Sequence, residues 1–303
     1  MTETTATKRR IDIKTGFNCN NRCLFCVQGN KRDLYEMRAT EQVKELLQEA
    51  RADADSIVFT GGEVTIRPDF FELLAIAREL DYKTIQIQTN GRMFASRDFC
   101  KRCIDAGATE FSPALHGHIP ELHDYLTRAP GSFKQTVHGL INLMELGQYV
   151  LTNSVITRPN FRHLPEIAKI LVRYGVAQYQ FAFVHAVGTA GANFKSMVPR
   201  KTLVEPYVKK GLDVGIRADR SVMTEAIPYC FMRGYEEYVA ERIIPRTKIF
   251  DAHATIEDYT DFRLNEGKLK GPPCEKCSMN DECEGPWREY PEAFGWDEFR
   301  PIK

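Results

Sequence analysis

Three cysteines near the N-terminus have the spacing of a metal-binding run. Cys19, Cys23 and Cys26 form a C-x₃-C-x₂-C pattern, which gathers three thiols within eight residues. A cluster of four irons takes thiolate ligands, so three cysteines this close can hold three of its irons. The fourth iron is then left open for a small molecule to coordinate. The pattern therefore predicts an iron–sulfur cluster with one free coordination site.

A glycine pair followed by a carboxylate lies downstream of these cysteines. Residues 58–60 are typical of a short apolar strand, and Gly61, Gly62 and Glu63 follow it directly. Glycines let the backbone approach a ligand closely, and Glu63 supplies negative charge for an ammonium group. Alone, such a tripeptide is usually a strand-to-loop turn. Its place one strand–helix unit after the cysteines makes it a second signal for ligand binding.

Together the two motifs resemble the signature of the radical S-adenosylmethionine (SAM) enzymes, including an aromatic residue, Phe25, before the last cysteine. The resemblance covers roughly the first two thirds of the chain. It implies that SAM chelates the open iron through its amino and carboxylate groups. It also implies that an electron from the cluster cleaves SAM to methionine and a 5′-deoxyadenosyl radical, which abstracts hydrogen from a substrate. Phe25 and Val27 would flank the adenine, and Gly61–Glu63 would bind the SAM amino group.

Two structural alternatives explain the first cysteines less well. A structural zinc site favours four ligands, usually in paired C-x₂-C knuckles. A disulfide framework belongs to short secreted chains. Cys100 and Cys103 form a separate C-x₂-C on an expected helix, where free cysteine behaves as a small hydrophobe. We therefore interpret that pair as packing residues.

Composition and charge limit the classes of function. The chain has 303 residues, 43% of them hydrophobic, and 41 basic residues balance 41 acidic ones. Nothing in this balance indicates electrostatic capture of nucleic acid or of an acidic membrane. The first seven residues carry no secretory signal, and no run approaches the ~18 apolar residues that a spanning helix needs. We expect a cytoplasmic protein, where nine cysteines indicate metal rather than disulfides.

Short apolar runs alternate with amphipathic helical stretches six times. The expected strands cover residues 11–15, 57–60, 84–89, 109–115, 149–157 and 176–184. This alternation predicts a parallel sheet with right-handed crossovers. Six units rather than eight indicate an α/β fold with an open, partial (β/α)₆ TIM-like barrel over residues 11–215, after an N-terminal tail of residues 1–10.

Polar side chains recur on one face of several expected strands. The members of this face are Gln86, Gln88, Asn90, Ser112, His116, Gln178 and Gln180. A parallel sheet buried on both faces should be almost continuously apolar. The polar face therefore predicts a wet or ligand-filled lumen, although such residues can also hydrogen-bond each other in a layered core.

Several residues fall at the carboxyl ends of the expected strands, where catalytic groups of such sheets gather. Asn90, Ser112 and His116 are candidates for contacts to SAM, and His185 lies at a similar strand end. Asn153 resembles the polar position that meets the SAM ribose in the family. His118 and His123 are as well explained as structural histidines of a loop.

A second cysteine group lies in a C-terminal region, residues 216–303, where the alternation fades. Cys274, Cys277 and Cys283 form C-x₂-C-x₅-C, which resembles the middle of the SPASM extension of radical SAM enzymes. The next cysteine of that pattern is replaced by Trp287, so the region resembles the shortened, twitch-type extension. Cys230 is chosen by elimination as the fourth ligand of an auxiliary 4Fe–4S cluster. Structural zinc is the alternative for this site.

The leading functional hypothesis is a radical SAM oxidoreductase acting on a ribosomally synthesised peptide by cross-linking, epimerisation or oxidation. A radical SAM dehydrogenase or modifying enzyme acting on a small-molecule metabolite is the alternative. A flavodoxin- or ferredoxin-type protein would supply electrons. A non-enzymatic iron–sulfur carrier or scaffold would explain the cysteines but not Gly61–Glu63. The aromatic C-terminal stretch, residues 285–299, is interpreted as a lid over the auxiliary site or the barrel mouth.

Overall fold

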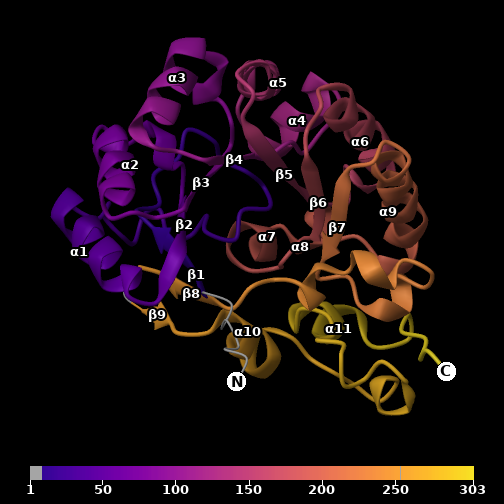
Figure 1. Ribbon diagram of the computed structural model, residues 1–303. Helices are drawn as coiled ribbons and strands as arrows, with labels where there is room; N and C mark the ends of the chain where they lie inside the picture. The colour runs from indigo at the N-terminus through magenta and orange to yellow at the C-terminus, as the bar shows by residue number, and fades with distance from the viewer. Residues whose placement is uncertain (1–8, 253) are drawn as a thin grey trace, which may run out of the picture.

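A nine-stranded, largely parallel sheet forms the centre of the computed structural model, which describes residues 9–252 and 254–303 (Figure 1). The strands are β1 Arg9–Lys14, β2 Ala54–Thr60, β3 Thr84–Thr89, β4 Glu110–Pro113, β5 Tyr149–Ile156, β6 Gln178–Phe183, β7 Ser221–Glu225, β8 Thr247–Phe250 and β9 Thr255–Ile256. Their order is β7-β6-β5-β4-β3-β2-β1-β8-β9, and only β8 and β9 are antiparallel. Because β7 and β9 lie at opposite ends of this order, the sheet is an open barrel.

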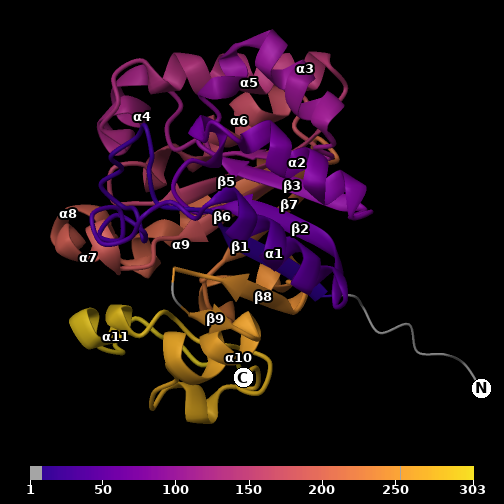
Figure 2. The same ribbon diagram turned by 90° about the vertical axis from the view of Figure 1, so that its left-hand side faces the viewer.

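Helices cover the outer side of the curved sheet. The helices are α1 Thr40–Arg51, α2 Phe70–Glu79, α3 Arg97–Ala106, α4 Pro120–Thr127, α5 Ser132–Glu145, α6 Leu164–Arg173, α7 Gly188–Ala192, α8 Phe194–Met197, α9 Lys201–Ile216, α10 Tyr259–Phe262 and α11 Glu289–Phe294. Figure 1 shows α1, α2, α3, α5, α6 and α9 around the outside. Figure 2 shows α10 and α11 on the side of the molecule where β8 and β9 lie. No helix among the described residues is long and apolar enough to cross a membrane.

The outer helices form because their apolar residues recur at helical spacing. In α6, Leu164, Ile167, Ala168 and Leu171 are buried, and Pro165 lies in the first turn, where a missing N–H costs nothing. In α3, the Cys100 and Cys103 side chains are fully buried in the core. The interpretation of these two cysteines as packing residues is confirmed.

The six predicted strands are present, each within a few residues of its expected bounds. The sheet, however, continues past residue 215: β7 pairs with β6, and β8 pairs with β1. The expected boundary near residue 215 therefore falls within the sheet rather than after it. Of the expected tail, residues 1–8 lie outside the described part of the chain, and β1 begins at Arg9.

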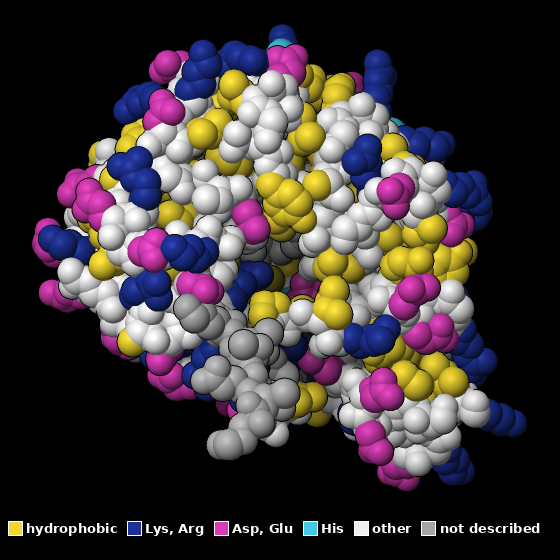
Figure 3. Space-filling view, in the orientation of Figure 1, with side chains coloured by type: hydrophobic (Ala, Val, Ile, Leu, Met, Phe, Trp, Pro, Cys, Tyr) yellow, Lys and Arg dark blue, Asp and Glu magenta, His cyan; other side chains and the backbone are white. Residues whose placement is uncertain are grey.

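The concave side of the sheet encloses two cavities. Gln86, Ser112 and Gln180 help to line one of about 340 Å³. His116 and Asn153 help to line a larger one of about 650 Å³, and Gln88 borders both. Figure 3 shows a hollow near the centre of the molecule in the orientation of Figure 1. The predicted polar lumen is confirmed, and some of its side chains also bind each other, since the Gln180 amide donates to Glu225 at 2.5 Å.

Candidate functional site

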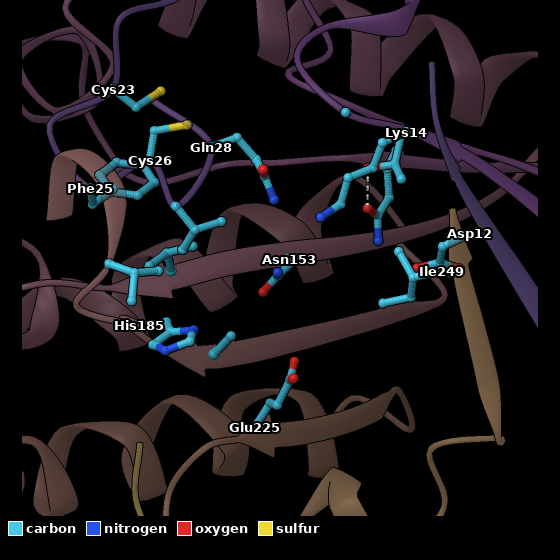
Figure 4. Close-up of a pocket in the computed structure, with 18 of the residues that line it drawn as sticks. Asp12, Lys14, Cys23, Phe25, Cys26, Gln28, Asn153, His185, Glu225 and Ile249 are labelled. Carbon is cyan, nitrogen blue, oxygen red and sulfur yellow. Dashed lines mark hydrogen bonds between the residues drawn. The ribbon is translucent and has the colours of Figure 1, made fainter. Parts of the chain in front are cut away.

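The loop after β1 carries the first cysteines to one end of the large cavity. Figure 4 shows the Cys23 and Cys26 thiols there, with the Phe25 ring beside them. The Asn21 N–H donates to Cys19 Sγ at 3.4 Å. Hydrogen bonds to sulfur of this kind are among the features that tune a cluster's thiolate ligands. Burial raises the pKa of all three thiols, so they need an electropositive partner to become thiolates.

The three thiols lie near one another, since, besides burial, Cys26 and Cys19 both help to raise the pKa of Cys23. Among the described residues, no three His, Cys, Asp or Glu side chains are arranged to hold a single metal ion. A cubane distributes its thiolates over different irons, so its ligands need not converge on one centre. The proximity of Cys19, Cys23 and Cys26 is compatible with three ligands of one such cluster.

The glycine pair packs directly against the cysteine loop. The Gly62 N–H donates to the Gly16 carbonyl and the Glu63 N–H to the Asn18 carbonyl, both at 2.8 Å. A Cβ atom on Gly62 would lie 2.2 Å from the Asn18 carbonyl oxygen. Gly61 has a φ of +130° and also lines the cavity. The glycines therefore let the turn after β2 approach the backbone of the cysteine loop closely. The two hydrogen bonds hold this loop against the end of β2.

The Glu63 carboxylate is held by donors from its own turn and from the end of β3. It is buried and accepts hydrogen bonds from the Asn90 N–H at 2.6 Å and the Thr89 hydroxyl at 2.7 Å. Thr65 donates to it as well, through its N–H at 3.2 Å. It does not line the large cavity. In the described conformation Glu63 fastens the glycine turn to the end of β3 rather than facing a ligand's ammonium group.

Two of the predicted SAM contacts face the large cavity in positions that suit that ligand. Asn153 lies near its centre in Figure 4, and its Oδ1 atom is buried without a hydrogen-bond partner among the described residues. An orphaned acceptor of this kind fits a ribose hydroxyl. The His116 ring lies edge-on to Phe25, with centroids 4.6 Å apart. Burial and the nearby His123 lower the pKa of His116 to about 3, so the imidazole is neutral.

Other predicted contacts lie outside the large cavity. The Asn90 side chain donates to Asn20 Oδ1 at 2.6 Å, on the cysteine loop, and Ser112 lines the smaller cavity. His123 accepts a hydrogen bond from the His116 N–H at 3.2 Å, and burial lowers its pKa to about 4. His118 stacks on His163 with centroids 4.5 Å apart. Neither His118 nor His123 lines the large cavity, and the role of these two histidines stays a prediction.

The aromatic C-terminal stretch forms part of the cavity wall. The Trp287 ring stacks on His185, with centroids 4.0 Å apart and planes 7° from parallel. His185 Nε2 lies 3.4 Å from a Glu289 carboxylate oxygen. The Trp287 indole N–H is buried without a partner among the described residues. Trp287, which stands where the SPASM pattern has a cysteine, thus lines the large cavity.

The second cysteine group comes together from two segments. Burial and the neighbouring Cys283, Cys274 and Cys277 raise the pKa of Cys230 to about 12, which places all four thiols near one another. The Ile302 N–H donates to Cys277 Sγ and the Gly285 N–H to Cys283 Sγ, both at 3.4 Å. These donors suit an iron–sulfur cluster held by four thiolates.

The large cavity is also lined by residues that the sequence analysis missed. These are Lys14, Lys31, Glu225 and Asp251, with Tyr259 from α10. Glu225 ends β7 and Asp251 follows β8, two strands that were not predicted, so no pattern placed them near the cysteines. The position of Lys14 at the end of β1, five residues before Cys19, was the one available signal.

An open parallel barrel that carries a cysteine loop at the carboxyl ends of its strands is the architecture of an α/β enzyme with an iron–sulfur cluster. Residues 13–171 match the model of the Radical SAM superfamily. The chain belongs to this superfamily, whose enzymes use a 4Fe–4S cluster and SAM, and the resemblance noted from the motifs is confirmed.

Curated relatives carry several different activities. The chain is 26% identical over 175 residues to an AdoMet-dependent heme synthase of Oleidesulfovibrio alaskensis, covering 57% of this chain and 45% of that protein. It is 33% identical over 167 residues to the mycofactocin maturase MftC of Mycobacterium tuberculosis, covering 52% and 40%. A probable GTP 3′,8-cyclase of Saccharolobus islandicus is 25% identical over 194 residues, covering 63% and 62%. The chain thus spans about half the length of these relatives.

Solved structures share the fold along most of the chain. SuiB of Streptococcus suis bound to S-adenosylmethionine covers 98% of this chain and 76% of its own, with a TM-score of 0.68 and 15% identity. The enzyme anSMEcpe with bound AdoMet covers 71% and 63%, with a TM-score of 0.58 and 18% identity. At these identities the likeness concerns the fold, which is the partial barrel of radical SAM enzymes, and in SuiB it extends over the cysteine-rich region.

Proposed function

We propose that this protein is a radical SAM oxidoreductase that modifies a ribosomally synthesised peptide. The observation that carries the proposal is the large cavity, which has Cys23, Cys26 and Phe25 at one end and Lys14 and Asp12 across from them. A peptide substrate is supported by the likeness to MftC and by the fold shared with SuiB, which has been solved with its precursor peptide SuiA.

The residues of this chain would divide the work as follows. Cys19, Cys23 and Cys26 hold the cluster, which when loaded with SAM supplies the 5′-deoxyadenosyl radical. Phe25 and the neutral His116 form the wall beside it, and Asn153 accepts a hydroxyl hydrogen bond. Cys230, Cys274, Cys277 and Cys283 hold an auxiliary cluster. The cavity walls keep bulk water from the reacting atoms.

The decisive test is formation of 5′-deoxyadenosine by anaerobically reconstituted protein given SAM and dithionite. We expect release in the parent protein and none in a Cys23→Ala variant. Cys103→Ala is the matched control, because it removes a buried thiol that packs in α3 instead of facing the cavity. SAM cleavage by Cys23→Ala, or none by a parent protein with its full iron content and a candidate peptide present, would overturn the proposal.

A second candidate is modification of a small-molecule metabolite. The heme synthase and GTP cyclase relatives favour it, as does the polar lumen beneath the large cavity. Mass spectrometry of a co-expressed precursor peptide discriminates the two candidates. A mass change that requires Cys23 supports the peptide, whereas 5′-deoxyadenosine production stimulated only by small metabolites supports the alternative.

A further inference from the structure

Two lysines, one at the end of β1 and one on the loop that follows it, share a single carboxylate on the wall of the large cavity. Lys14 Nζ lies 2.6 Å and Lys31 Nζ 2.7 Å from the same oxygen, Oδ2 of Asp251. Figure 4 shows Lys14 across the cavity from Cys23 and Cys26. The two lysines and Asp251 all line the large cavity.

The charges in this group do not balance. The second oxygen of Asp251 accepts the Ala252 N–H at 2.7 Å, and the Arg38 guanidinium donates to the Asp251 main-chain carbonyl. One carboxylate therefore faces two ammonium groups. Each ammonium has three N–H donors, and among the described residues Lys14 and Lys31 each use one of them in a hydrogen bond.

The other acidic side chains of the lumen make their hydrogen bonds to groups other than the two lysines. Asp12 is engaged by Arg10, whose Nε and Nη2 atoms donate to its two oxygens at 2.7 and 3.0 Å. Glu225 accepts from the Gln180 amide, and burial together with the nearby Glu241 raises its pKa. The lysine pair thus offers unused donors and one net positive charge to whatever occupies the cavity.

We propose that Lys14 and Lys31 bind a carboxylate of the substrate and so orient it towards the cluster side of the cavity. This inference deepens the proposed function, since it describes the substrate of the same site. The carboxylate belongs either to a peptide, at its C-terminus or on an acidic side chain, or to a small organic acid. The aromatic wall formed by Tyr259 and Trp287 would contact the apolar part of the same substrate.

The test compares a carboxylate with its neutral isostere. Isothermal titration calorimetry on the cluster-loaded, SAM-bound protein measures binding of 3-phenylpropanoate and of 3-phenylpropanamide. Hydrogen bonds between charged partners are stronger than neutral ones, so we expect the acid to bind about tenfold more tightly. Lys14→Gln and Lys31→Gln should each reduce that preference, and Lys14→Arg should retain it.

Lys83→Gln is the matched control, because it removes an exposed lysine that pairs with Asp81 away from the cavity. It should leave the preference unchanged. Equal binding of acid and amide, no binding of either, or a preference that survives both glutamine variants would overturn the inference. Iron content and circular dichroism establish that each variant is folded and loaded.

A second arm identifies the source of the carboxylate. N-acetyl-Gly-Gly-Phe with a free C-terminus is compared with its C-terminal amide and with 3-phenylpropanoate. Tighter binding of the peptide acid assigns the site to peptides, and binding of the small acid alone assigns it to metabolites. If neither the peptide acid nor the small acid bound more tightly than the amide while 5′-deoxyadenosine still formed, the carboxylate site would be refuted and the proposed function would stand.

Discussion

At the scale of single residues, Asn153 offers a direct test of where SAM lies. Asn153 lines the large cavity, and its buried Oδ1 lacks a partner among the described residues. Asn153→Ala should therefore weaken SAM binding about tenfold, as expected for one lost hydrogen bond. Calorimetric titration of the cluster-loaded variant measures this.

The matched control for this substitution is Asn142→Ala. Asn142 donates to the Phe94 and Ala95 carbonyls, outside the cavity. Its loss should reduce stability while leaving SAM affinity unchanged. If Asn153→Ala bound SAM as tightly as the parent protein, the ribose would not lie against β5.

The two buried histidines beside the cavity predict how stability depends on pH. The pKa of His116 is about 3 and that of His123 about 4, whereas an unfolded histidine titrates near 6.5. As pH falls below 6.5, the unfolded state takes up protons that the native state does not. The free energy of unfolding should thus fall by about 1.4 kcal/mol per pH unit for each histidine, down to about pH 4.

Urea unfolding of the loaded protein at pH 6.5 and 5.5 measures this dependence. His116→Gln keeps an acceptor for the Val155 N–H, which His116 Nδ1 receives at 3.2 Å, but does not titrate. This variant should lose about half of the pH dependence that His116 and His123 together give to the free energy of unfolding. If the free energy of unfolding of His116→Gln depended on pH as steeply as that of the parent protein, His116 would bind as many protons in the native state as in the unfolded state.

Glu63 illustrates what the sequence can predict about one residue. The position of its motif after β2 agrees with the sequence pattern, whereas the contacts of its carboxylate were not predicted. These contacts depend on Thr89 and Asn90 at the end of β3, whose donors capture the carboxylate. Such contacts arise only when β2 and β3 are placed side by side, so one strand's pattern does not reveal them.

At the scale of elements, the contact between the glycine turn and the cysteine loop should be sensitive to a single added methyl group. A Cβ on Gly62 would lie 2.2 Å from the Asn18 carbonyl oxygen and 2.5 Å from Phe17 backbone atoms. Gly62→Ala should therefore displace the cysteine loop and reduce the iron content of reconstituted protein. Iron and acid-labile sulfide assays measure the loss.

Gly234→Ala is the control for this substitution. Gly234 has a φ of +78° but open space around its Cβ position, so the change adds only backbone strain. It should keep the full iron content. Equal iron in Gly62→Ala and the parent would show that the loop accommodates the displacement.

The elements also differ in how well the sequence predicted them. The first six strands carry apolar runs separated by amphipathic helices, which is the signal that pattern analysis uses. The strands β7 to β9 have five, four and two residues, and no helix separates β8 from β9. Their pairing with β6 and β1 is a long-range effect, so the far wall of the site could not be predicted.

At the scale of the whole molecule, two four-iron clusters predict about eight irons per chain after reconstitution. Cys230→Ala should reduce this to about four, because Cys230 lies with Cys274, Cys277 and Cys283. Metal analysis with Mössbauer spectroscopy distinguishes the clusters. A parent protein with about four irons and one tightly held zinc would contradict an auxiliary cluster.

The pairing of β8 with β1 means that the last part of the chain shields the first strand. Residues Arg10 to Ile13 of β1 are in register with Thr247 to Phe250 of β8. A protein truncated at residue 215 would leave β1 with an unpaired side, and exposed strand edges promote aggregation. The motif-bearing first 215 residues are therefore a poor choice for separate expression, because their first strand depends on β8 for its partner.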